Sequence, residues 1–516
     1  MSIRISKIKL LNFKRFVNYE IEPNDKINII VGDNETGKSS ILQAIDLVAS
    51  GSIRKVETLG LETLFNTKAI EKFQSSERTI ENLPELIIEL YLDGTNDFTL
   101  NGKNNTERRS CDGIRLVCKP NPDFYTEITE SLKEEKYFPF DFYSIRFSTF
   151  ADEGYSGYKK KLRSILINSS EMDSDYATND FIHRAYLQYT EDRPNERAVH
   201  KNRYRLMKTD FSNKQLSELN ARIPSENNYK FALKNSSVYS FENDLMVYED
   251  GISIDNKGTG RQIFIKTELA LKRSGANTDV VLIEEPENHL SAYNLRKLVN
   301  KLKREVDGQL FITTHSSFIS TRLELNNLQI IQNEDRPLKL NQLENDTAKY
   351  FIKAPPVGII DFILSPKTIL VEGPSEFMLM ESFYEHLTGS KPEDDNVNIL
   401  DIRGLSFKRY LEIAKLTKSQ VAVVTDNDGN YEKNCIEKYN DFKSLKNIKI
   451  FFERDNSKKT FELVLFGDNA DICGELFKDA QIMIANKTES AYKLLTSDLT
   501  LNVPQYIRNA VEWIKD

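Results

Sequence analysis

The chain has 516 residues, of which 39% are hydrophobic and 29% charged, and its formal net charge is −8. This length and balance predict a soluble globular protein of two or three domains. They argue against a membrane protein, because no apolar run approaches the roughly 18–20 residues needed to cross a bilayer. The N-terminus MSIRISKIKLLNF alternates charged and apolar residues, unlike a signal peptide, so we expect a cytoplasmic protein. The four scattered cysteines lack CxxC spacing, which argues against zinc and disulfide frameworks.

The first motif with chemical content follows a short apolar run. KINIIV (26–31) predicts a buried strand, GDNETGKSS a glycine loop, and SSILQAIDLV a helix. A P-loop requires this order of strand, loop and helix, because backbone N–H groups then surround phosphate at a helix N-terminus. Lys38 would reach the β- and γ-phosphates, and the Ser39 hydroxyl would bind Mg²⁺. The residues expected to surround the nucleotide are Gly32, Asp33, Asn34, Glu35, Thr36, Gly37, Lys38, Ser39 and Ser40.

A charged segment separates this loop from the rest of the ATPase. IENLPELIIELYLDG (80–94) predicts a strand of the ATPase sheet, and residues from about 155 to 235 have a more helical pattern in YKKKLRSILI, FIHRAYLQY and LSELNARI. They lack a sustained heptad repeat, which favours a short helical insert over a coiled-coil arm. RPNERAVHKNRYRLMK (193–208) is strongly basic. It could contact phosphate backbones, or it could be a solvated helix face, which is the more common explanation.

Two acids follow the next buried strand. TDVVLIEEPENHL (278–290) predicts a strand that ends in Glu284, which would ligate Mg²⁺ directly or through water, and Glu285, which would orient or deprotonate the attacking water. The alternative is the ordinary bias of helix N-termini toward acids.

Two further segments suit a nucleotide site. GQLFITTHSS predicts a strand ending at His315, which could contact the γ-phosphate or have a structural role. The loop NKGTGRQ (256–262) contains Gly258 and Gly260, which could present backbone amides to a nucleotide held by a second subunit.

Together, GDNETGKS, NKGTGRQ, LIEEPENHLS and TTHSS resemble the Walker A, signature, Walker B/D-loop and H-loop of an ABC-type ATPase of the SMC-like branch. The opening IRISKIKLLNFKRF is also similar to the first strands of that branch. The resemblance implies ATP as cofactor, with two nucleotides held between two heads, and therefore a homodimer or a higher homo-oligomer. Lys38 and Glu285 lie far apart in the sequence, so we expect an insert within the head, with a helical insert or dimerisation region at about 155–235.

The second half predicts a smaller α/β domain. A boundary is expected near 350–366, where TAKYFIKAPPVGIIDFILSPK carries two prolines. Strand-like and helix-like segments then alternate through TILVEG, PSEFMLMESFYEHL, VNILDIRG, SFKRYLEIAKL and QVAVVTDNDGN, which predicts a largely parallel sheet. We therefore expect an ATPase domain over 1–350, a linker over 351–366 and a second domain over 367–516.

Three acids lie at the predicted carboxyl ends of these strands, where function concentrates in open parallel sheets. Glu372 follows TILV, and Asp426 and Asp428 follow VAVVT. Such hard oxygen ligands suit Mg²⁺ or Mn²⁺ rather than zinc. An Asp-Asn-Asp-Gly turn is common in loops, but its pairing with VEG on a neighbouring strand favours a metal site.

VEGPSE and TDND resemble the TOPRIM domain, and an SMC-like ATPase ahead of a TOPRIM domain resembles the OLD (overcoming lysogenization defect) family of ATP-dependent nucleases. Gly404 in DIRGLSF, the segment KKTFELVLF and the tail NKTESAYKLL…VPQYIRNAVEWI add to this resemblance, which spans nearly the whole chain. It implies one metal site at Glu372, Asp426 and Asp428, and a second held with help from Glu376 and Glu462. It also implies that Lys487 neutralises transition-state charge, although Lys493 and the pair Lys458–Lys459 are near it in sequence. Mg²⁺ is the expected ion, with Mn²⁺ or Ca²⁺ as alternatives.

The resulting prediction is an α/β protein that acts as an ATPase and as a metal-dependent DNA endonuclease or nickase, whose cleavage is regulated by nucleotide. Family resemblance implies antiphage defence, alone, with a UvrD-like helicase, or beside a reverse transcriptase and its RNA–DNA product. The sequence lacks a primase's zinc-binding cysteines and shows no recognisable topoisomerase breakage domain. The remaining alternative is an ATP-driven DNA sensor or clamp that does not cleave.

Overall fold

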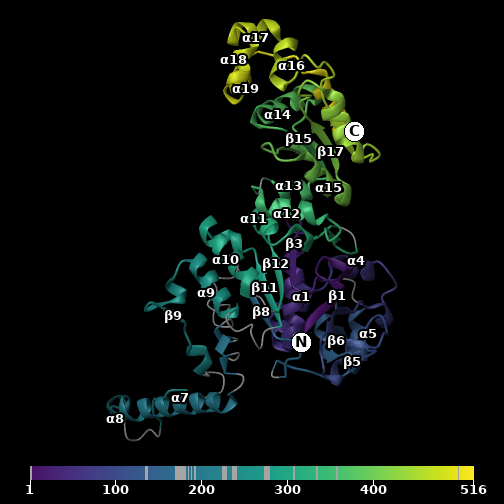
Figure 1. The fold of residues 1–516 in the computed structure, drawn as a ribbon. Coiled ribbons are helices and arrows are strands. Elements are labelled where there is room, and N and C mark those ends of the chain that lie inside the picture. Colours follow the sequence, from purple (N-terminus) through teal and green to yellow (C-terminus); the bar gives the residue numbers. More distant parts are fainter. Residues whose placement is uncertain are drawn as a thin grey trace. The chain divides into compact units, whose positions relative to one another are not determined.

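The computed structural model describes residues 3–133, 138–157, 159–168, 182–183, 185–186, 189–190, 193–223, 229–234, 241–271, 279–305, 308–332, 335–355, 358–497 and 499–515. Internal contacts divide the chain into two compact units. The first comprises residues 1–30, 34–314 and 333–336, and the second comprises 31–33, 315–332 and 337–516. The two units are described separately, and their elements are labelled in Figure 1.

The first unit contains an antiparallel sheet. Its strands are β1 (Arg4–Phe13), β2 (Phe16–Ile21), β4 (Leu86–Asp93), β5 (Asn101–Gly102), β6 (Cys111–Pro120) and β7 (Tyr143–Thr149). They are ordered β2-β1-β4-β6-β5, and β7 also pairs with β6. All residues of β4 except Asp93 are buried, as expected for a central strand covered on both faces. This confirms the strand predicted within 80–94.

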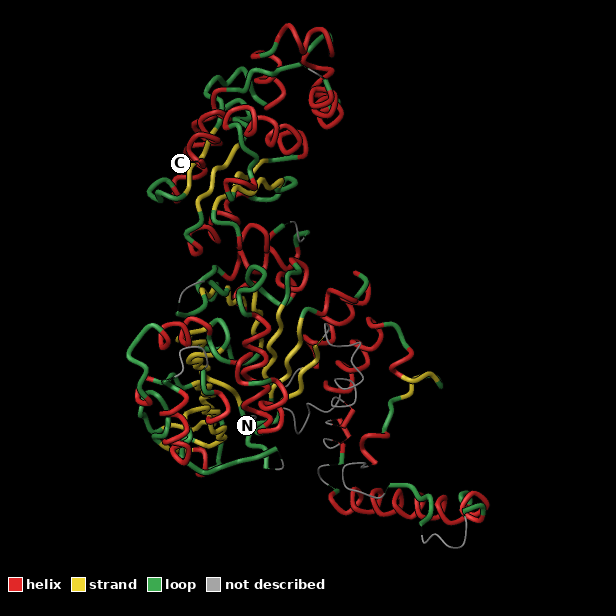
Figure 2. Tube along the Cα trace, turned by 180° about the vertical axis from the view of Figure 1, so that it is seen from behind, coloured by secondary structure: helices red, strands yellow, loops and turns green. Residues whose placement is uncertain are grey.

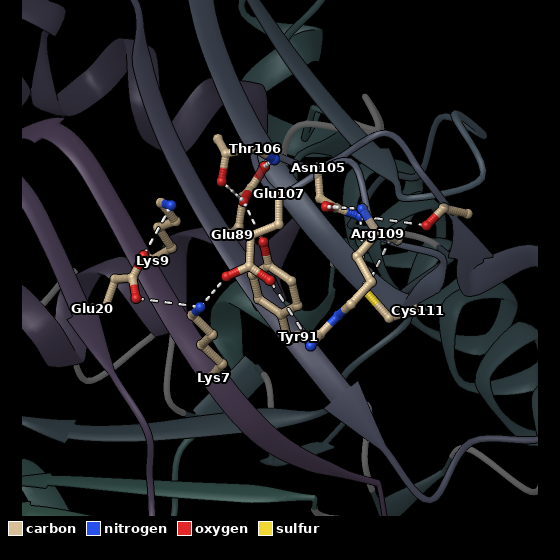
Figure 3. A network of polar contacts seen from close by, with 11 residues as sticks. Lys7, Lys9, Glu20, Glu89, Tyr91, Asn105, Thr106, Glu107, Arg109 and Cys111 are labelled. Carbon is tan, nitrogen blue, oxygen red and sulfur yellow. Dashed lines mark hydrogen bonds and ion pairs between the residues drawn. The ribbon is translucent and has the colours of Figure 1, made fainter.

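A polar network holds the segment between β5 and β6 against this sheet (Figure 3). Glu89 of β4 is fully buried, and its carboxylate accepts hydrogen bonds from the Tyr91 hydroxyl (3.0 Å), the Thr106 amide (2.9 Å) and the Thr106 hydroxyl (2.7 Å). Lys7 of β1 pairs with Glu107 of the same segment. A buried carboxylate is costly unless its lone pairs are used, so this network determines how the segment packs.

The second sheet of the first unit is parallel. Its strands β8 (Ser164–Asn168), β11 (Val280–Glu284), β12 (Gln309–Thr313) and β3 (Ile27–Val31) are neighbours in that order. Registers such as Ile283–Ile312 and Ile312–Ile29 align their carboxyl ends. The strands predicted in KINIIV, VVLIE and QLFIT are confirmed.

The helical interpretation of YKKKLRSILI is wrong for its second half. Ser164–Asn168 forms strand β8, paired in parallel with β11 from Val280–Ser164 to Glu284–Asn168. The run SILIN is short and apolar, and periodicity alone does not distinguish such a run in a helix from one in a buried strand. Pairing with β11 satisfies its backbone groups and decides the outcome.

Helices of the first unit surround these sheets. α1 (Lys38–Ser50) contacts strands of both sheets, including β4, β6, β8 and β11, so its residues are mostly buried. α9 (Thr259–Leu271) contacts β8 and α10 (Ala292–Glu305). The shorter elements are α2 (Ile53–Leu59), α3 (Leu61–Leu64), α4 (Thr67–Gln74), α5 (Tyr125–Ser131), β9 (Tyr248–Glu249) and β10 (Ile252–Ser253).

The predicted helical insert contains α7 (Pro194–Lys214) and α8 (Ser217–Ala221). One face of α7 packs on the segment 241–244, where Lys201 Nζ lies 2.7 Å from the Glu242 carboxylate and Tyr204 contacts Phe241. Arg203 and Arg205 are exposed to solvent. Much of FIHRAYLQY, and residues 169–181 of the insert, lie outside the described residues. Neither interpretation of 193–208, as a DNA contact or as a solvated face, is tested by this packing.

The second unit starts with α11 (Ser317–Arg322), the antiparallel pair β13 (Leu328–Ile330) and β14 (Leu338–Lys339), α12 (Asn345–Lys353) and α13 (Ile359–Leu364). The end of α12 and all of α13 therefore lie in the segment 351–366 that was predicted as a linker. The domain boundaries drawn from the sequence stay a prediction.

A four-stranded sheet forms the centre of the second unit (Figure 2). Its strands β16 (Val397–Asp401), β15 (Lys367–Val371), β17 (Gln420–Val424) and β18 (Ile448–Phe451) are neighbours in that order and all parallel. Parallel strands need covering on both faces. The side chains of Ile369 and Val371 belong to a core shared with α14 (Pro374–Thr388) and α20 (Gln505–Lys515). α15 (Phe407–Thr417) also contacts β17, and α13 contacts β16. The predicted alternation of strands and helices is confirmed.

Four short helices follow β18: α16 (Phe461–Asp468), α17 (Ala470–Phe477), α18 (Ala480–Ala485) and α19 (Lys487–Thr496). They are drawn in yellow in Figure 1, beside α14, and α19 contacts α14. This contact brings the N-terminus of α19 to the carboxyl edge of the sheet. None of the helices among the described residues is long and apolar enough to span a membrane. Cys118, Cys435 and Cys473 are buried thiols, and Cys111 is partly exposed.

Candidate nucleotide and metal sites

The loop between β3 and α1 forms a cavity of about 390 Å³ in the first unit. Gly37, the residue before α1, has a φ of +95°, and a Cβ there would lie 2.6 Å from Phe16 Cζ and 2.7 Å from Arg15 Cδ. Only glycine fits this conformation and space. Lys38 is 5% exposed and begins α1 at the cavity wall. The lining residues are Lys14, Arg15, Asn34, Glu35, Gly37, Lys38, Ser39, Ser40 and Glu285, whereas Gly32, Asp33 and Thr36 are not among them.

Glu285 reaches this cavity from the end of β11. Its φ of +39° places it in the left-handed region, which costs a non-glycine residue energy and is commonest at functional sites. Its amide donates to Thr313 O (3.0 Å), and Asn288 Nδ2 donates to its Oε2 (2.9 Å). The carboxylate is thus held at the phosphate loop, and its role in orienting or deprotonating the attacking water stays a prediction. Glu284 is buried in register with Thr313 and does not line the cavity, so its role as a Mg²⁺ ligand stays a prediction.

The loop NKGTGRQ has a steric requirement at its second glycine. A Cβ on Gly260 would lie 2.3 Å from His289 O, so the loop and the segment after β11 approach each other at backbone distance. Gly258, by contrast, has open space around it. Lys257 and Arg261 both pair with Glu249 and hold its pKa well below the usual range, at about 2. The loop is therefore held in place, and its predicted contact with a second subunit's nucleotide stays a prediction.

His315 lies two residues after the end of β12 and is exposed. Its predicted contact with the γ-phosphate stays a prediction.

Two cavity residues were missed from the sequence. Lys14 and Arg15 form the turn between β1 and β2, where Lys14 has a φ of +49°. The Lys14 amide donates to Leu64 O (2.7 Å), and Arg15 Nη1 donates to Glu35 O in the phosphate loop. The available signal was NFKRF, which had been used for family resemblance only. These two cations add positive charge beside Lys38, as a triphosphate site requires.

In the second unit, Glu372 links the two central strands. It follows β15, and its Oε1 accepts hydrogen bonds from the Thr425 hydroxyl (2.5 Å) and the Asp426 amide (3.1 Å), both beyond β17. Its carbonyl accepts from the Gly404 amide (3.1 Å), which lies beyond β16. Three loops at the carboxyl edge of the sheet are thus joined through one glutamate. The predicted convergence of Glu372 and Asp426 is observed.

In the turn DNDG (426–429), the side chain of Asn427 determines the position of the two aspartates beside it. Asn427 is 1% exposed, and its Nδ2 donates to the carbonyls of Glu453 (2.9 Å), Asp455 (3.0 Å) and Lys458 (3.2 Å). Asp428 has a φ of +50° and is exposed. The Asn427 side chain therefore ties the turn to the loop after β18, which leaves the aspartates on either side of it available. This role of Asn427 was missed from the sequence, which carries no local signal for it.

A second group of acids lies deeper. Glu376 of α14 is 7% exposed and Glu462 of α16 is 1% exposed. Burial, then repulsion from Glu462 and Glu372, raises the pKa of Glu376 to about 7. Burial and the charges of Glu372, Glu376 and Glu462 raise the pKa of Asp426 to about 8. These groups therefore interact as one cluster of negative charge that favours a cation.

Lys487 supplies the one basic group predicted for this cluster. Its Nζ lies 2.9 Å from Glu462 Oε2 as an ion pair. Both Glu462 oxygens are buried, and Lys487 is the ionic partner of Oε2. The hydroxyl of Thr460, two residues before Glu462, is also buried and has no hydrogen-bond partner. Thr460 was missed from the sequence.

The cluster suits a divalent cation by its chemistry. All of its donors are oxygens, which Mg²⁺ and Mn²⁺ prefer, and buried oxygens without partners are costly unless something binds them. Across the residues that the structure describes, no three acidic, cysteine or histidine side chains are arranged closely enough to hold a metal ion.

The fold and these sites define an α/β protein that joins an ABC-type P-loop ATPase head to a small TOPRIM domain with a parallel sheet. The chain belongs to the AAA ATPase domain family, which matches residues 3–320. Residues 363–428 match the overcoming lysogenization defect protein-like TOPRIM domain. The protein is thus an OLD-type fusion of an ATPase and a TOPRIM domain, which confirms the family resemblance.

A relative and two solved structures show further similarity. A retron Vc95 probable ATPase from Vibrio cholerae serotype O1 biovar El Tor is 23% identical over 400 residues, which cover 66% of this chain and 75% of that protein. The SMC head domain from Thermotoga maritima is 15% identical, with 65% of this chain and 97% of that chain covered and a TM-score of 0.28. A RecF–ATP structure is 14% identical, with 61% and 94% covered and a TM-score of 0.34. Scores this low carry no argument, so the assignment rests on the chain's own geometry and the family matches.

Proposed function

We propose that the protein is a metal-dependent DNA endonuclease or nickase whose TOPRIM cleavage is regulated by the nucleotide state of its ATPase head. The observation that carries the proposal is the acid cluster at one sheet edge, where the backbone amide of Asp426 donates to the Glu372 carboxylate (3.1 Å) and Glu462 pairs with Lys487. Such a cluster of oxygen ligands beside a lysine is suited to phosphodiester hydrolysis.

Each residue has a separate task in this proposal. Glu372, Asp426 and Asp428 would hold one Mg²⁺, with Mn²⁺ or Ca²⁺ as alternatives, and Glu376 and Glu462 would help to hold a second. Bound ions of this kind activate water and stabilise the leaving oxygen in an in-line displacement. The Thr425 hydroxyl and the Asp426 amide orient the Glu372 carboxylate, and Asn427 holds the turn that carries both aspartates.

Charge compensation is the task of Lys487. The transition state of phosphodiester hydrolysis accumulates negative charge, and a positioned cation stabilises it. Because Lys487 now pairs with Glu462, the ion pair must loosen when substrate and metal enter.

In the ATPase head, Lys38 would bind the phosphates of ATP, Ser39 and Glu284 the Mg²⁺, and Glu285 the attacking water. His315 would contact the γ-phosphate. Gly258 and Gly260 would present their loop to the nucleotide of a second copy, so that the heads form a homodimer or a higher homo-oligomer.

The biological context is part of the proposal. The relative that is named as a retron ATPase supports a role in antiphage defence in the cytoplasm. A reverse transcriptase with its RNA–DNA product, or a UvrD-like helicase, would be the partner, with DNA as the substrate.

Cleavage of supercoiled plasmid tests the proposal. With Mg²⁺ or Mn²⁺ we expect nicked or linear product from the wild-type protein and none from Glu372→Ala. Glu381→Ala, an exposed acid on the same helix as Glu376, should cut normally. Lys38→Ala reports on nucleotide control through a changed response to ATP. If the wild type binds DNA in an ATP-dependent manner but never cuts, a non-cleaving clamp replaces the nuclease.

A further inference from the structure

Cationic side chains lie on both sides of the acid cluster along the edge of the TOPRIM sheet. The strand order β16-β15-β17-β18 is entirely parallel, so the loops after the four strands form one row. Along this row stand Arg403 after β16, Glu372 after β15, Asp426 and Asp428 after β17, and Lys459 after β18. Asp401 at the end of β16, and Glu453, Arg454, Asp455 and Lys458 after β18, also lie along this row. Arg403 and Lys459 are exposed cations on the two sides of the acid cluster.

The loop that carries Arg403 is tied to the acid cluster. Arg403 has a φ of +50°, in the left-handed region, and its amide donates to Asp401 Oδ1 (2.6 Å). The next amide, of Gly404, donates to the carbonyl of Glu372 (3.1 Å). The Arg403 side chain is 72% exposed, and its Nε lies 4.0 Å from Asp401 Oδ2, at the limit of an ion pair. A strained backbone thus holds an accessible guanidinium one strand away from Glu372.

Lys459 is tied to the cluster from the other side. Its carbonyl accepts a hydrogen bond from the Asp428 amide (3.2 Å). A Cβ added to Gly429 would lie 3.5–3.7 Å from the side-chain carbons of Lys459, so the aliphatic part of this lysine passes over the DNDG turn. Lys459 is exposed. Its ammonium is therefore available to an anion beside Asp428.

We propose that Arg403 and Lys459 bind phosphates about two nucleotides to either side of the scissile one, so that a single DNA strand crosses the sheet edge from β16 to β18. This proposal rests on the proposed endonuclease function. A dense acid cluster repels a polyanion, and flanking cations are needed to bring its backbone there. Three strand spacings span about 14 Å, and the axial rise of one DNA strand covers that length in about four nucleotides. Arginine suits the task because its planar fork matches phosphate oxygens.

Binding of a short DNA duplex to the full-length protein, measured over a range of salt concentrations in Ca²⁺, tests the proposal. Arg403→Gln and Lys459→Gln should each weaken binding by about threefold to tenfold and lower the slope of log affinity against log salt by about one. In cleavage assays, KM should rise while kcat changes little. Arg403→Lys and Lys459→Arg should restore the slope, which a merely structural role would not predict.

The chain offers matched controls. Lys418, which also has a positive φ (+58°), and Lys446 are exposed lysines that lie two residues before the first residues of β17 and β18, at the opposite edge of the same sheet. Lys418→Gln and Lys446→Gln should leave the salt slope unchanged. Equal slopes for all four glutamine variants and the wild type would overturn the proposal.

A neutral methylphosphonate at the phosphate about two nucleotides to one side of the cut locates the contacts. It should weaken binding by the wild type but not weaken binding by the corresponding glutamine variant any further. If the methylphosphonate weakens DNA binding by both glutamine variants as much as it weakens binding by the wild type, the proposed path of the DNA strand is refuted. If the wild type cuts no DNA, the endonuclease proposal fails, whereas the salt slopes still decide whether these residues bind phosphates.

Discussion

Substituting Asp426 with Asn tests whether the acid cluster of the TOPRIM domain holds repulsive charge when no metal is bound. Burial and the charges of Glu372, Glu376 and Glu462 raise the pKa of Asp426 from 3.8 to about 8. Between these two pH values the folded state binds more protons than the unfolded state. The free energy of unfolding therefore falls as the pH rises through this window and levels off above about pH 8.

The size of the effect follows from the pKa shift. Each pKa unit corresponds to about 1.4 kcal/mol, so the full shift has an upper limit of about 6 kcal/mol. Asp426 is partly exposed, and solvent screening reduces the expected gain for Asp426→Asn to about 1–3 kcal/mol near pH 8. For a unit of this size, such a gain raises the Tm by about 3–10 °C. Near pH 5 the gain should be much smaller, because the cost of protonating the carboxyl in the folded state is small there.

Thermal unfolding in EDTA between about pH 5 and pH 9 measures this difference. The control Asp441→Asn removes an exposed acid from the same domain and should leave the Tm unchanged. Added Mg²⁺ should stabilise the wild type more than Asp426→Asn, and the variant should not cleave DNA. If Asp426→Asn is no more stable than the wild type near pH 8, or its gain does not grow with pH, the repulsive cluster is refuted.

Three other substitutions have definite expected outcomes. Gly37→Ala introduces a Cβ within 2.6 Å of a neighbouring ring at a φ of +95°. We expect loss of ATP binding in a calorimetric titration, while the circular dichroism spectrum stays native. Normal ATP affinity would contradict the assignment of this cavity as the nucleotide site. Asn427→Ala removes three hydrogen bonds from the loop after β18; denaturant unfolding should show a loss of about 2–4 kcal/mol together with lost cleavage, and an unchanged cleavage rate would contradict its positioning role. Glu89→Ala leaves the buried Tyr91 hydroxyl and the Thr106 hydroxyl without their partner and should cost about 2–4 kcal/mol; Glu85→Ala, on the exposed end before β4, should cost much less.

Local sequence patterns predicted the structure correctly wherever one short segment contains both the residues that fix its backbone and the residues that carry its chemistry. KINIIV, GDNETGKSS and the helix after them were predicted as strand, phosphate loop and helix, because the required backbone path depends on glycines within the motif itself. VEG and TDND were predicted at strand ends for the same reason. Periodicity failed at SILIN, since only pairing with β11 made this short apolar run a strand.

The deeper members of the acid site depended on tertiary structure. Nothing near Asn427 in the sequence indicates that its amide will bind three carbonyls of a loop about 30 residues later. In the same way, only family resemblance predicts one site for Glu376, Glu462 and Lys487. In the structure, α14, which carries Glu376, contacts α19, which carries Lys487, and Lys487 pairs with Glu462.

The sequence by itself determined the two motifs, their order and the family, because these depend on residue type and short spacing. The tertiary structure decided which charges meet: it buried Glu462 beside Lys487, brought Arg15 to the phosphate loop, and placed Arg403 and Lys459 on either side of the acids. Electrostatic energy depends on distance in space and on burial, and neither can be read from positions along the chain.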